Sequence, residues 1–417
     1  MSPPHLLLLS AGVFVAVLRL RWPFPLALAA TAVIAGIAGT LGFPFRHLVE
    51  GSFGFLNLML ALFAGAWFGQ AALQTGLAAS FAQGLLRVTR ARPVLSLGAV
   101  ALLLFAVGMF TGLAGVAVLT VGAFAAPVLR RIGLAPHDAA AFIAVEATCG
   151  MIAPPVNLPA MMIADGVNMP FLNFDRTLLV ISVPVALFAV YVFARRCRTP
   201  LAVEEPQNTR PALLGAAPLA LVLVFWLLLR SFPAEIYDPG VPAVLVVAGM
   251  FMLPLLGLRA ARTSVEDAFS GTPLHLAAAL AAVGMLVQIM TLTGMRGWLV
   301  IQTMASDAPW LHLLLVAMPL LGGVLTSAGT SNILGVPFAF AFIHQDMIIN
   351  VSALSSIAAL SEFVPPTAIG AALAGYVVGE GRLLPIVRAA LPPVVLLFAI
   401  SMALMVFAKP LARFLTG

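Results

Sequence analysis

Two stretches of this sequence place an acidic residue shortly before a pair of adjacent prolines inside an apolar segment. Glu146 precedes Pro154–Pro155, and Glu362 precedes Pro365–Pro366. Proline has no backbone N–H and its ring clashes with the preceding turn, so two prolines in a row cannot continue a regular helix. Each break therefore frees backbone polar groups near a carboxyl group. The chemistry that this favours is the binding of small ions or the carriage of a proton.

Small residues and residues with hydroxyl or amide side chains cluster near these breaks in both halves of the sequence. Oxygen atoms of these types are hard ligands suited to a hard cation, so we expect them, together with Glu362, to form Na+ and substrate sites. Two alternatives stay open, because small residues also pack at helix contacts and a buried glutamic acid can be a neutral partner of a free carbonyl near a kink. The candidate residues are Thr111, Gly112, Gly115, Gly150, Asn157, Thr326, Ser327, Gly329, Thr330, Ser331, Asn332 and Thr367.

The composition limits the class of protein that can carry these residues. Of 417 residues, 62% are hydrophobic and only 9% are charged, with a mean hydropathy of +1.11. In a typical soluble domain about a quarter of the residues are charged. The two cysteines suggest neither a disulfide framework nor a metal site. The net charge of +6 comes from basic residues spread over short loops, which indicates membrane orientation and no nucleic-acid partner.

Apolar segments long enough to cross a bilayer organise the whole chain. A hydrocarbon core of about 30 Å requires about 20 apolar helical residues. The sequence therefore predicts an all-α polytopic membrane protein with about ten transmembrane helices. The predicted spans are 5–20, 23–43, 53–76, 137–166, 176–195, 211–231, 240–258, 272–294, 347–379 and 384–408.

Two further apolar stretches, 93–131 and 308–343, are too long for one span. Each is interrupted near its centre, at Met109–Gly115 and at Leu325–Asn332, which leaves limbs of about 11–16 residues, shorter than a crossing needs. We expect both to be re-entrant helical hairpins whose tips meet near the middle of the membrane. Irregular backbone at that depth must be buried in protein or line a watery cavity.

Charged residues flanking the hairpins predict their orientation. Arg90 and Arg131 flank the first hairpin, and basic residues favour the cytoplasmic side. The second hairpin is flanked by Asp307 and Asp346 and should begin and end on the opposite side. Both chain termini are then periplasmic.

The two halves of the chain follow the same plan in opposite orientations, which predicts an inverted repeat. Residues 1–200 form the first repeat, with the hairpin at about 93–131 and the Pro-Pro-broken helix at about 137–166. Residues 201–417 form the second, with the corresponding elements at about 308–343 and 347–379.

Motifs for catalysis do not occur in the sequence. It has no P-loop, no glycine-rich dinucleotide fingerprint and no His/Cys metal cluster, so we expect no enzymatic activity and no cofactor. Transport by such a chain would use an ion gradient.

Residues Met109–Gly166 resemble the large membrane subunit of the TRAP (tripartite ATP-independent periplasmic) transporters, within the ion transporter superfamily. The similarity rests on the hairpin tip, the basic pair Arg130–Arg131 before Gly133, an Ala-rich helix, and a break at 150–159. This break reads Gly-Met-Ile-Ala-Pro-Pro-Val-Asn-Leu-Pro and is similar to the family's Gly-Ile-x-x-Pro-Pro-x-x-x-Pro element. In the second half, Phe363–Gly370 is similar to the family's Thr-Pro-Pro-Val-Gly element.

This resemblance implies a sodium-coupled elevator that imports organic acids such as dicarboxylates or sugar acids. It also implies a bacterial cytoplasmic (inner) membrane, a small four-helix membrane subunit and a periplasmic substrate-binding protein as partners. One alternative is a stand-alone carboxylate/cation symporter of the same superfamily, since Thr330-Ser331-Asn332 is similar to a Ser-Asn-Thr signature found there. A channel or a non-transporting membrane scaffold is the alternative from another class.

Overall fold

The structure is a computed structural model that describes the 417-residue chain except residues 41, 199–210, 233–237, 307 and 416–417. Asp307, which the sequence predicts to be external, lies outside the described residues. All regular secondary structure in the described part is helical. Seven helical segments there are long and apolar enough to cross a membrane: 45–74, 93–111, 114–131, 175–194, 258–292, 313–341 and 383–406. The chain is a multi-pass helical membrane protein.

The described part of the first half contains ten helices. They are α1 (Pro3–Arg19), α2 (Phe24–Thr40), α3 (Phe45–Ser52), α4 (Leu56–Gln74), α5 (Leu77–Val88), α6 (Pro93–Thr111), α7 (Ala114–Arg131), α8 (Pro136–Met151), α9 (Leu158–Gly166) and α10 (Asp175–Ala194). Eight of them correspond to the predicted spans and the first hairpin, whereas α3 and α5 lie between predicted segments.

The second half repeats this order and ends with one additional short helix. Its helices are α11 (Ala212–Ser231), α12 (Val241–Met250), α13 (Leu258–Ala268), α14 (Gly271–Leu292), α15 (Met295–Met304), α16 (Ala308–Thr330), α17 (Val336–Ala341), α18 (Met347–Ala359), α19 (Ile369–Val378), α20 (Leu383–Val406) and α21 (Ala408–Leu415). A π-helical turn, Ser331–Gly335, joins α16 to α17.

The predicted limb lengths of the first hairpin are wrong. In the first hairpin, α6 has 19 residues and α7 has 18, and each is a candidate span in its own right. The predicted interruption, Met109–Gly115, was too wide, because Met109 and Phe110 continue α6 and Ala114 already begins α7. Limb length therefore does not distinguish re-entrant hairpins from ordinary spans.

Glycine and proline set several of the helix starts. Helices α6 and α8 begin at Pro93 and Pro136, where a missing N–H removes no intrahelical hydrogen bond. Helices α5 and α15 each follow a glycine, Gly76 and Gly294, with φ of 75° in both. Backbone with positive φ favours glycine because it has no Cβ. The same local chemistry thus starts two helices that occupy matching places in the two halves.

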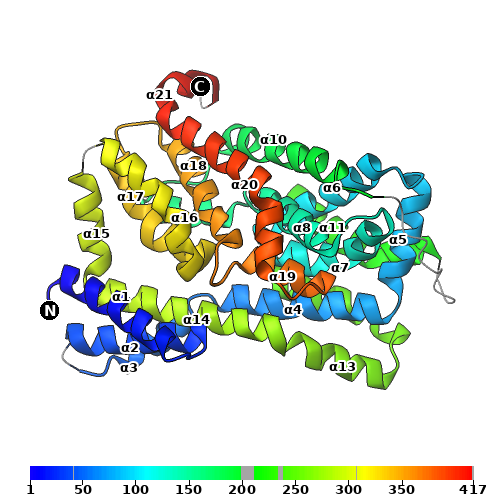
Figure 1. Cartoon of the computed structure of the whole chain (residues 1–417), viewed down its shortest axis with the longest axis horizontal. Coiled ribbons are helices and arrows are strands. Elements are labelled where there is room, and N and C mark those ends of the chain that lie inside the picture. The colour runs from blue at the N-terminus through cyan, green and yellow to red at the C-terminus, as the bar shows by residue number, and fades with distance from the viewer. Residues whose placement is uncertain (41, 199–210, 233–237, 307, 416–417) are drawn as a thin grey trace.

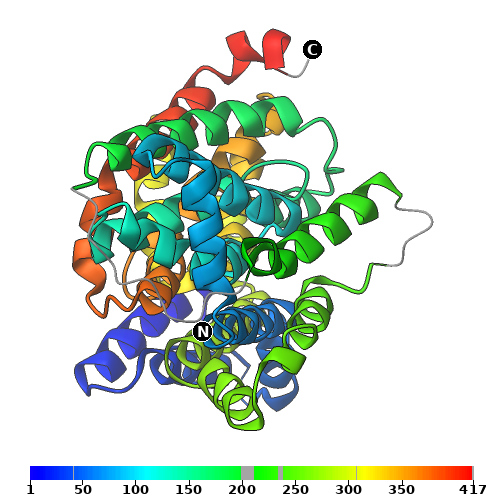
Figure 2. The same cartoon turned by 90° about the vertical axis from the view of Figure 1, so that its right-hand side faces the viewer.

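Two layers of helices make up the molecule. Helices α1–α4, α13 and α14 form one layer, and the hairpins and broken helices lie above it (Figures 1 and 2). Corresponding helices of the two halves make reciprocal contacts with the other half. Helices α2 and α3 of the first half pack on α14 of the second, and α12 and α13 of the second half pack on α4 of the first. Likewise α11 contacts α5, and α1 contacts α15.

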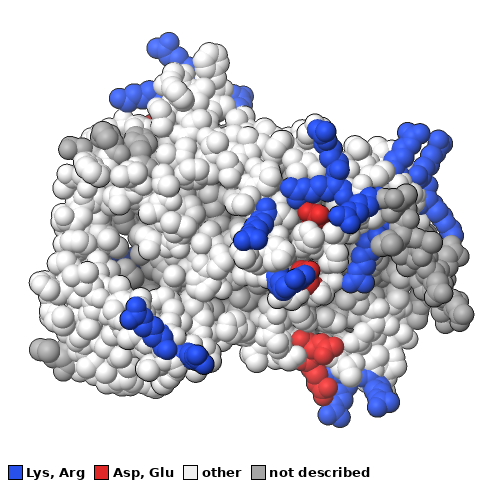
Figure 3. Space-filling view, viewed as in Figure 1, with Lys and Arg blue, Asp and Glu red and all other residues white. Residues whose placement is uncertain are grey.

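Charged side chains gather toward the end of the long axis at which α5 meets α6 (Figure 3). At this end Arg130 Nη2 donates to the carbonyl of Val378 at 2.7 Å, and Arg196 Nη1 donates to Asp138 Oδ1 at 2.8 Å and to Ala389 O at 3.0 Å. The first bond joins the end of α7 to the end of α19, and the other two join the end of α10 to the first turn of α8 and to the second turn of α20. We call this region the basic end and the opposite one, near α15 and α17, the far end.

The arrangement predicts opposite sidedness for the two ends. Cysteines introduced at Arg90 and Arg131 should react with a membrane-impermeant thiol reagent from one face, and a cysteine at the exposed His344 from the other. The measurement is labelling in right-side-out and inside-out vesicles. Labelling of positions 90 and 131 from opposite faces would make the stretch between them a single ordinary span and would contradict the hairpin.

Candidate ion and substrate site

The two hairpin tips are single sharp turns of the backbone. Gly112 ends α6 with φ of 67°, and Leu113 is extended before α7 begins. In the second hairpin Thr326 alone interrupts α16, with φ of 64° and ψ of 168°. The predicted interruption Leu325–Asn332 was therefore too wide. The region that Thr326 occupies is essentially restricted to glycine, so a β-branched residue there is strained by about 1–3 kcal/mol.

Both Pro-Pro pairs lie between helices and are bound to the neighbouring hairpin in the same way. The N–H of Val156, directly after the first pair, donates to the carbonyl of Met109 at 3.3 Å. The N–H of Thr367, directly after the second pair, donates to the carbonyl of Gly323 at 3.0 Å, and its hydroxyl donates to the same oxygen at 2.8 Å. Each acceptor lies three residues before its tip, so hairpin and break form a unit in each half.

The two units also correspond in where the first limb of the hairpin packs closely on the segment before the Pro-Pro pair. A Cβ on Gly108 would lie 2.9 Å from the backbone of Gly150, and a Cβ on Gly322 would lie 2.9 Å from the Cβ of Ser361. Both glycines lie four residues before their tips. Real Cβ atoms do not approach one another so closely, so these positions admit no larger side chain without a shift.

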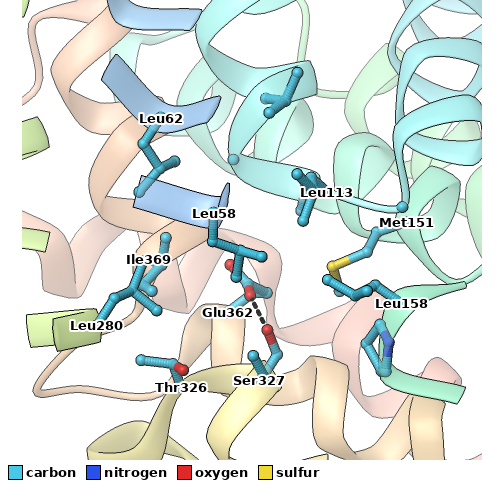
Figure 4. A pocket seen from close by; sticks show the side chains of 16 residues that line it. Leu58, Leu62, Leu113, Met151, Leu158, Leu280, Thr326, Ser327, Glu362 and Ile369 are labelled. Carbon is cyan, nitrogen blue, oxygen red and sulfur yellow. Dashed lines mark hydrogen bonds between the residues drawn. The ribbon is translucent and has the colours of Figure 1, made fainter. Parts of the chain in front are cut away.

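The two units meet at a small cavity (Figure 4). Its volume of about 40 Å³ suffices for a few water molecules at roughly 10–15 Å³ each, or for an ion with water. The residues that line it are Leu58, Leu62, Gly112, Leu113, Ala114, Gly115, Val116, Met151, Leu158, Pro159, Leu280, Thr326, Ser327, Ala328, Glu362 and Ile369. We call it the tip cavity.

All polar side chains in the described lining of the tip cavity come from the second half, and the first half contributes apolar side chains and glycines. Leu113 directly follows the first tip, while Ser327 directly follows the second. Met151 lies three residues before the first Pro-Pro pair, and Glu362 lies three residues before the second. Glu362 is the only ionisable side chain in the lining.

Four helices begin at the tip cavity: α7 at Ala114, the second limb of the second hairpin at Ser327, α9 at Leu158 and α19 at Ile369. The first N–H groups of a helix have no intrahelical acceptor, and the helix dipole adds positive potential at that end. The backbone therefore favours an anion here without a basic side chain.

The carboxyl group of Glu362 occupies this positive region. Its Oε1 accepts a 2.5 Å hydrogen bond from the Ser327 hydroxyl, seen as the dashed line in Figure 4. Its Oε2 is buried, lies near the backbone of Gly370 in the first turn of α19, and makes no hydrogen bond of ordinary geometry. An oxygen with a free lone pair beside a cavity of this size is suited to a cation or a water molecule.

The structure divides the predicted site residues into two groups. Gly112, Gly115, Thr326, Ser327 and Glu362 line the tip cavity. The remaining ones do not line it, and several of them make hydrogen bonds or close contacts within the helices. Thr111, Thr330 and Ser331 donate to the carbonyls of Val107, Thr326 and Ser327, respectively, while Gly150 and Gly329 lie at helix contacts.

Asn157 and Asn332 differ in how their side chains are used. Asn157 Oδ1 caps α9 by accepting from Ala160 N at 2.9 Å, and its Nδ2 donates to Ile152 O and Ser355 Oγ at 3.0 and 3.1 Å. Asn332 Oδ1 is buried with no hydrogen-bond partner. Thr367 lies at the edge of a second, larger cavity.

Glu146 lies outside the tip cavity. It is fully buried in α8, and both of its carboxyl oxygens lack a hydrogen-bond partner. A charge without a partner in an apolar interior is costly, which favours the neutral acid. Sequence reasoning did not identify Met151, Leu58 or Leu280 as part of the site, because an apolar residue in an apolar span carries no signal of its own.

No protein-family model matches the chain, and no curated protein matches it either. The case for a function therefore rests on the residues and their geometry.

Replacing Thr326 tests whether the second tip is held in a strained conformation. We expect Thr326→Gly to raise the melting temperature of the purified protein, because relieving about 1–3 kcal/mol of strain outweighs the roughly 0.5–1 kcal/mol entropic cost of glycine. Thr326→Ser keeps both the hydroxyl and the strain and serves as the control. A lower melting temperature for the glycine variant would show that the threonine is not strained.

Asn157 separates a structural role from an ion-binding one. Both Asn157→Ala and Asn157→Asp remove the Nδ2 donor, so we expect each to destabilise the protein by about 1–3 kcal/mol. An ion ligand would behave differently, since aspartate is the better cation ligand. Thermal unfolding across a sodium titration decides: a stability that depends more steeply on sodium in the aspartate variant would assign Asn157 to an ion site.

Proposed function

We propose that this chain is a sodium-coupled secondary transporter of organic acids, the large membrane subunit of a TRAP-type system. The observation that carries the proposal is the tip cavity, at which four helix N-termini, the Ser327 and Thr326 hydroxyls and the Glu362 carboxyl converge. Helix starts favour a substrate carboxylate, and oxygen ligands favour a sodium ion beside it.

The corresponding parts of the two halves support an inverted repeat, residues 1–200 and 201–417. Hairpin and break are joined by the same backbone hydrogen bond in each half, from Val156 to Met109 and from Thr367 to Gly323. Contacts outside these units are reciprocal as well: α2 of the first half packs on α14 of the second, and α12 of the second half packs on α4 of the first. Ten spans with two re-entrant hairpins remain our proposed topology, supported by tips that meet inside the molecule.

An elevator mechanism follows from this division into layers. The hairpins and broken helices would move as a body that carries the tip cavity, against a scaffold formed by the lower layer. At about 40 Å³ the cavity has room only for ions or water, so an organic acid requires the tips to separate. A small cavity lined mostly by apolar residues favours a transporter over a channel, which needs a continuous polar path.

The proposed setting is a bacterial cytoplasmic membrane, with both termini periplasmic and the basic end cytoplasmic. A small four-helix membrane subunit and a periplasmic substrate-binding protein are the proposed partners. A stand-alone carboxylate/cation symporter is the alternative. Reconstitution of this chain alone, and then with a small subunit and binding protein encoded beside it, separates the two.

The direct test is uptake of a panel of radiolabelled organic acids into proteoliposomes, with and without a sodium gradient. We expect gradient-dependent accumulation of at least one acid at a steady turnover. Uptake that is driven only by the gradient of the acid and does not depend on sodium would contradict the proposal.

Glu362 provides the sharper test of coupling. Glu362→Gln keeps the shape and one oxygen but removes the charge, so we expect the apparent sodium affinity to fall roughly tenfold, about 1.4 kcal/mol, with a flat pH dependence. Glu146→Gln is the matched control, the same change in a buried acid outside the tip cavity, and should leave sodium affinity unchanged. If Glu362→Gln instead abolishes a pH dependence of uptake, Glu362 carries a proton.

A further inference from the structure

Another cavity lies at the basic end, where the two layers meet. Its volume is about 290 Å³, near the lower limit of the range of roughly 300–1,000 Å³ that is typical of small-molecule sites. Helix α4 of the lower layer contributes to its wall, together with α7 and α19, which lie above α4 (Figure 1). We call it the seam cavity, and its lining residues are Leu73, Ala126, Pro127, Arg130, Arg131 and Val377.

The wall of the seam cavity is cationic at the end of α7 and apolar elsewhere. Arg130 and Arg131 are the last two residues of α7, while Ala126 lies five residues before the end of that helix. At a rise of about 1.5 Å per residue, five residues correspond to roughly 7.5 Å along the helix. Leu73 and Val377, each next to the last residue of its helix, complete the apolar part. A ligand that matches this wall has an anionic group joined to an apolar chain.

The two guanidinium groups have most of their hydrogen-bonding capacity left. Each guanidinium has five N–H donors and no acceptor. Within the described part of the chain the pair makes one hydrogen bond, from Arg130 Nη2 to the carbonyl of Val378 at 2.7 Å, and no ion pair. Arg196 at the same end is different, since Asp138 Oδ1 lies 2.8 Å from it. Arg130 and Arg131 therefore bring two positive charges that no described carboxylate compensates.

The helix ends at the seam cavity reduce this positive charge without cancelling it. A helix C-terminus carries a partial charge of about −0.5, and α4, α7 and α19 all end here. Three such partial charges are smaller than the two full charges of the arginines. Two of the carbonyls are also occupied, because Gly76 N–H donates to Leu73 O at 3.2 Å and Gly133 N–H donates to Arg130 O at 3.1 Å. The balance favours an anion.

A phospholipid is the anion that uses both parts of the wall. The planar fork of arginine matches the oxygen atoms of a phosphate group and forms two parallel hydrogen bonds with it. Inorganic phosphate would use the arginines alone and leave the apolar side chains of Leu73, Ala126 and Val377 uncovered. A phospholipid places an acyl chain on them, and the bilayer around a multi-pass helical protein supplies it.

We propose that the seam cavity binds one anionic phospholipid, whose phosphate group lies on Arg130 and Arg131 and whose acyl chain begins on Leu73, Ala126 and Val377. The lipid contacts both layers, since α4 belongs to one layer and α7 and α19 to the other. It therefore stabilises the packing of the two layers at the basic end. This inference requires only that the chain spans a membrane and is independent of the function proposed above.

Native mass spectrometry of the full-length protein in detergent tests the lipid site. The probes are dioleoylphosphatidylglycerol, which is anionic, dioleoylphosphatidylcholine, which has the same chains and no net charge, and inorganic phosphate. The double variant Arg130→Gln/Arg131→Gln removes both charges of the seam cavity. Its matched control is Arg90→Gln/Arg92→Gln, which removes two exposed charges at the same end that do not line the cavity.

We expect the wild-type chain to bind one phosphatidylglycerol at least roughly tenfold more tightly than phosphatidylcholine. The affinity should fall roughly fivefold in Arg131→Gln and more than roughly tenfold in the double variant, because each basic residue near a lipid surface contributes about fivefold. The control pair should change it less than about twofold, since salt screens charges at a distance. Arg131→Gln keeps the bond from Arg130 to Val378, so this variant remains informative if the double variant does not fold.

Leu73→Trp tests the apolar part of the wall separately. Leu73 is 39% exposed, so a larger side chain can replace it and fill the cavity while both arginines stay in place. We expect this variant to lose phosphatidylglycerol affinity at least roughly fivefold, because the acyl chain then has no apolar surface to cover. Phosphatidylglycerol should also raise the melting temperature of the wild-type chain more than that of Arg131→Gln, because a ligand that binds only the folded chain stabilises it.

Three results would overturn the inference. Equal affinities for phosphatidylglycerol and phosphatidylcholine would show that the site does not distinguish the charge of the headgroup. Wild-type phosphatidylglycerol affinity in Arg131→Gln and in the double variant would remove the arginines from the site. If Leu73→Trp keeps wild-type affinity for the lipid, and an excess of inorganic phosphate displaces it, then the arginines bind a phosphate group without the apolar wall. No arm of the test measures transport, so its outcome and that of the uptake assay are independent.

Discussion

Backbone hydrogen bonding in a water-poor interior is the constraint on which the centre of this molecule depends. A helix that stops within an apolar environment leaves N–H and C=O groups that must find other partners. Here the chain begins four helices at one place and joins each Pro-Pro break to a hairpin limb, through Val156 and Met109 in one half and Thr367 and Gly323 in the other. The helix starts lie at the tip cavity, so the same constraint that threatens the fold also shapes the candidate site.

The two halves use a common backbone plan for different chemistry. In the first half Leu113 and Met151 occupy the positions that Ser327 and Glu362 occupy in the second. The first half gives the tip cavity an apolar wall, and the second half supplies the oxygen atoms. An apolar wall lowers the local dielectric constant and strengthens electrostatic interactions inside, so the first half would favour ion binding without a ligand of its own.

The helix bounds could be predicted closely because they depend on local chemistry and on bilayer thickness. The predicted broken span 137–166 corresponds to α8 and α9, which run from Pro136 to Gly166. The arrangement of the side chains could not be predicted in the same way. The orientation of Asn157, which caps α9, depends on a contact with Ser355, about 200 residues away. The backbone of Thr326 takes a conformation typical of glycine, which local preferences argue against.

The carboxylate of Glu362 also has a consequence for charge counting. In its ionised form it places one negative charge where the four helix starts converge, before any solute arrives. For the transporter proposed above, an incoming organic acid would meet a like charge in the same cavity, and the helix dipoles supply only partial positive charges. The proposal then implies a stoichiometry: each acid would enter with enough cations to neutralise itself and Glu362 together, so this one side chain would set a minimum on the net positive charge that accompanies the solute.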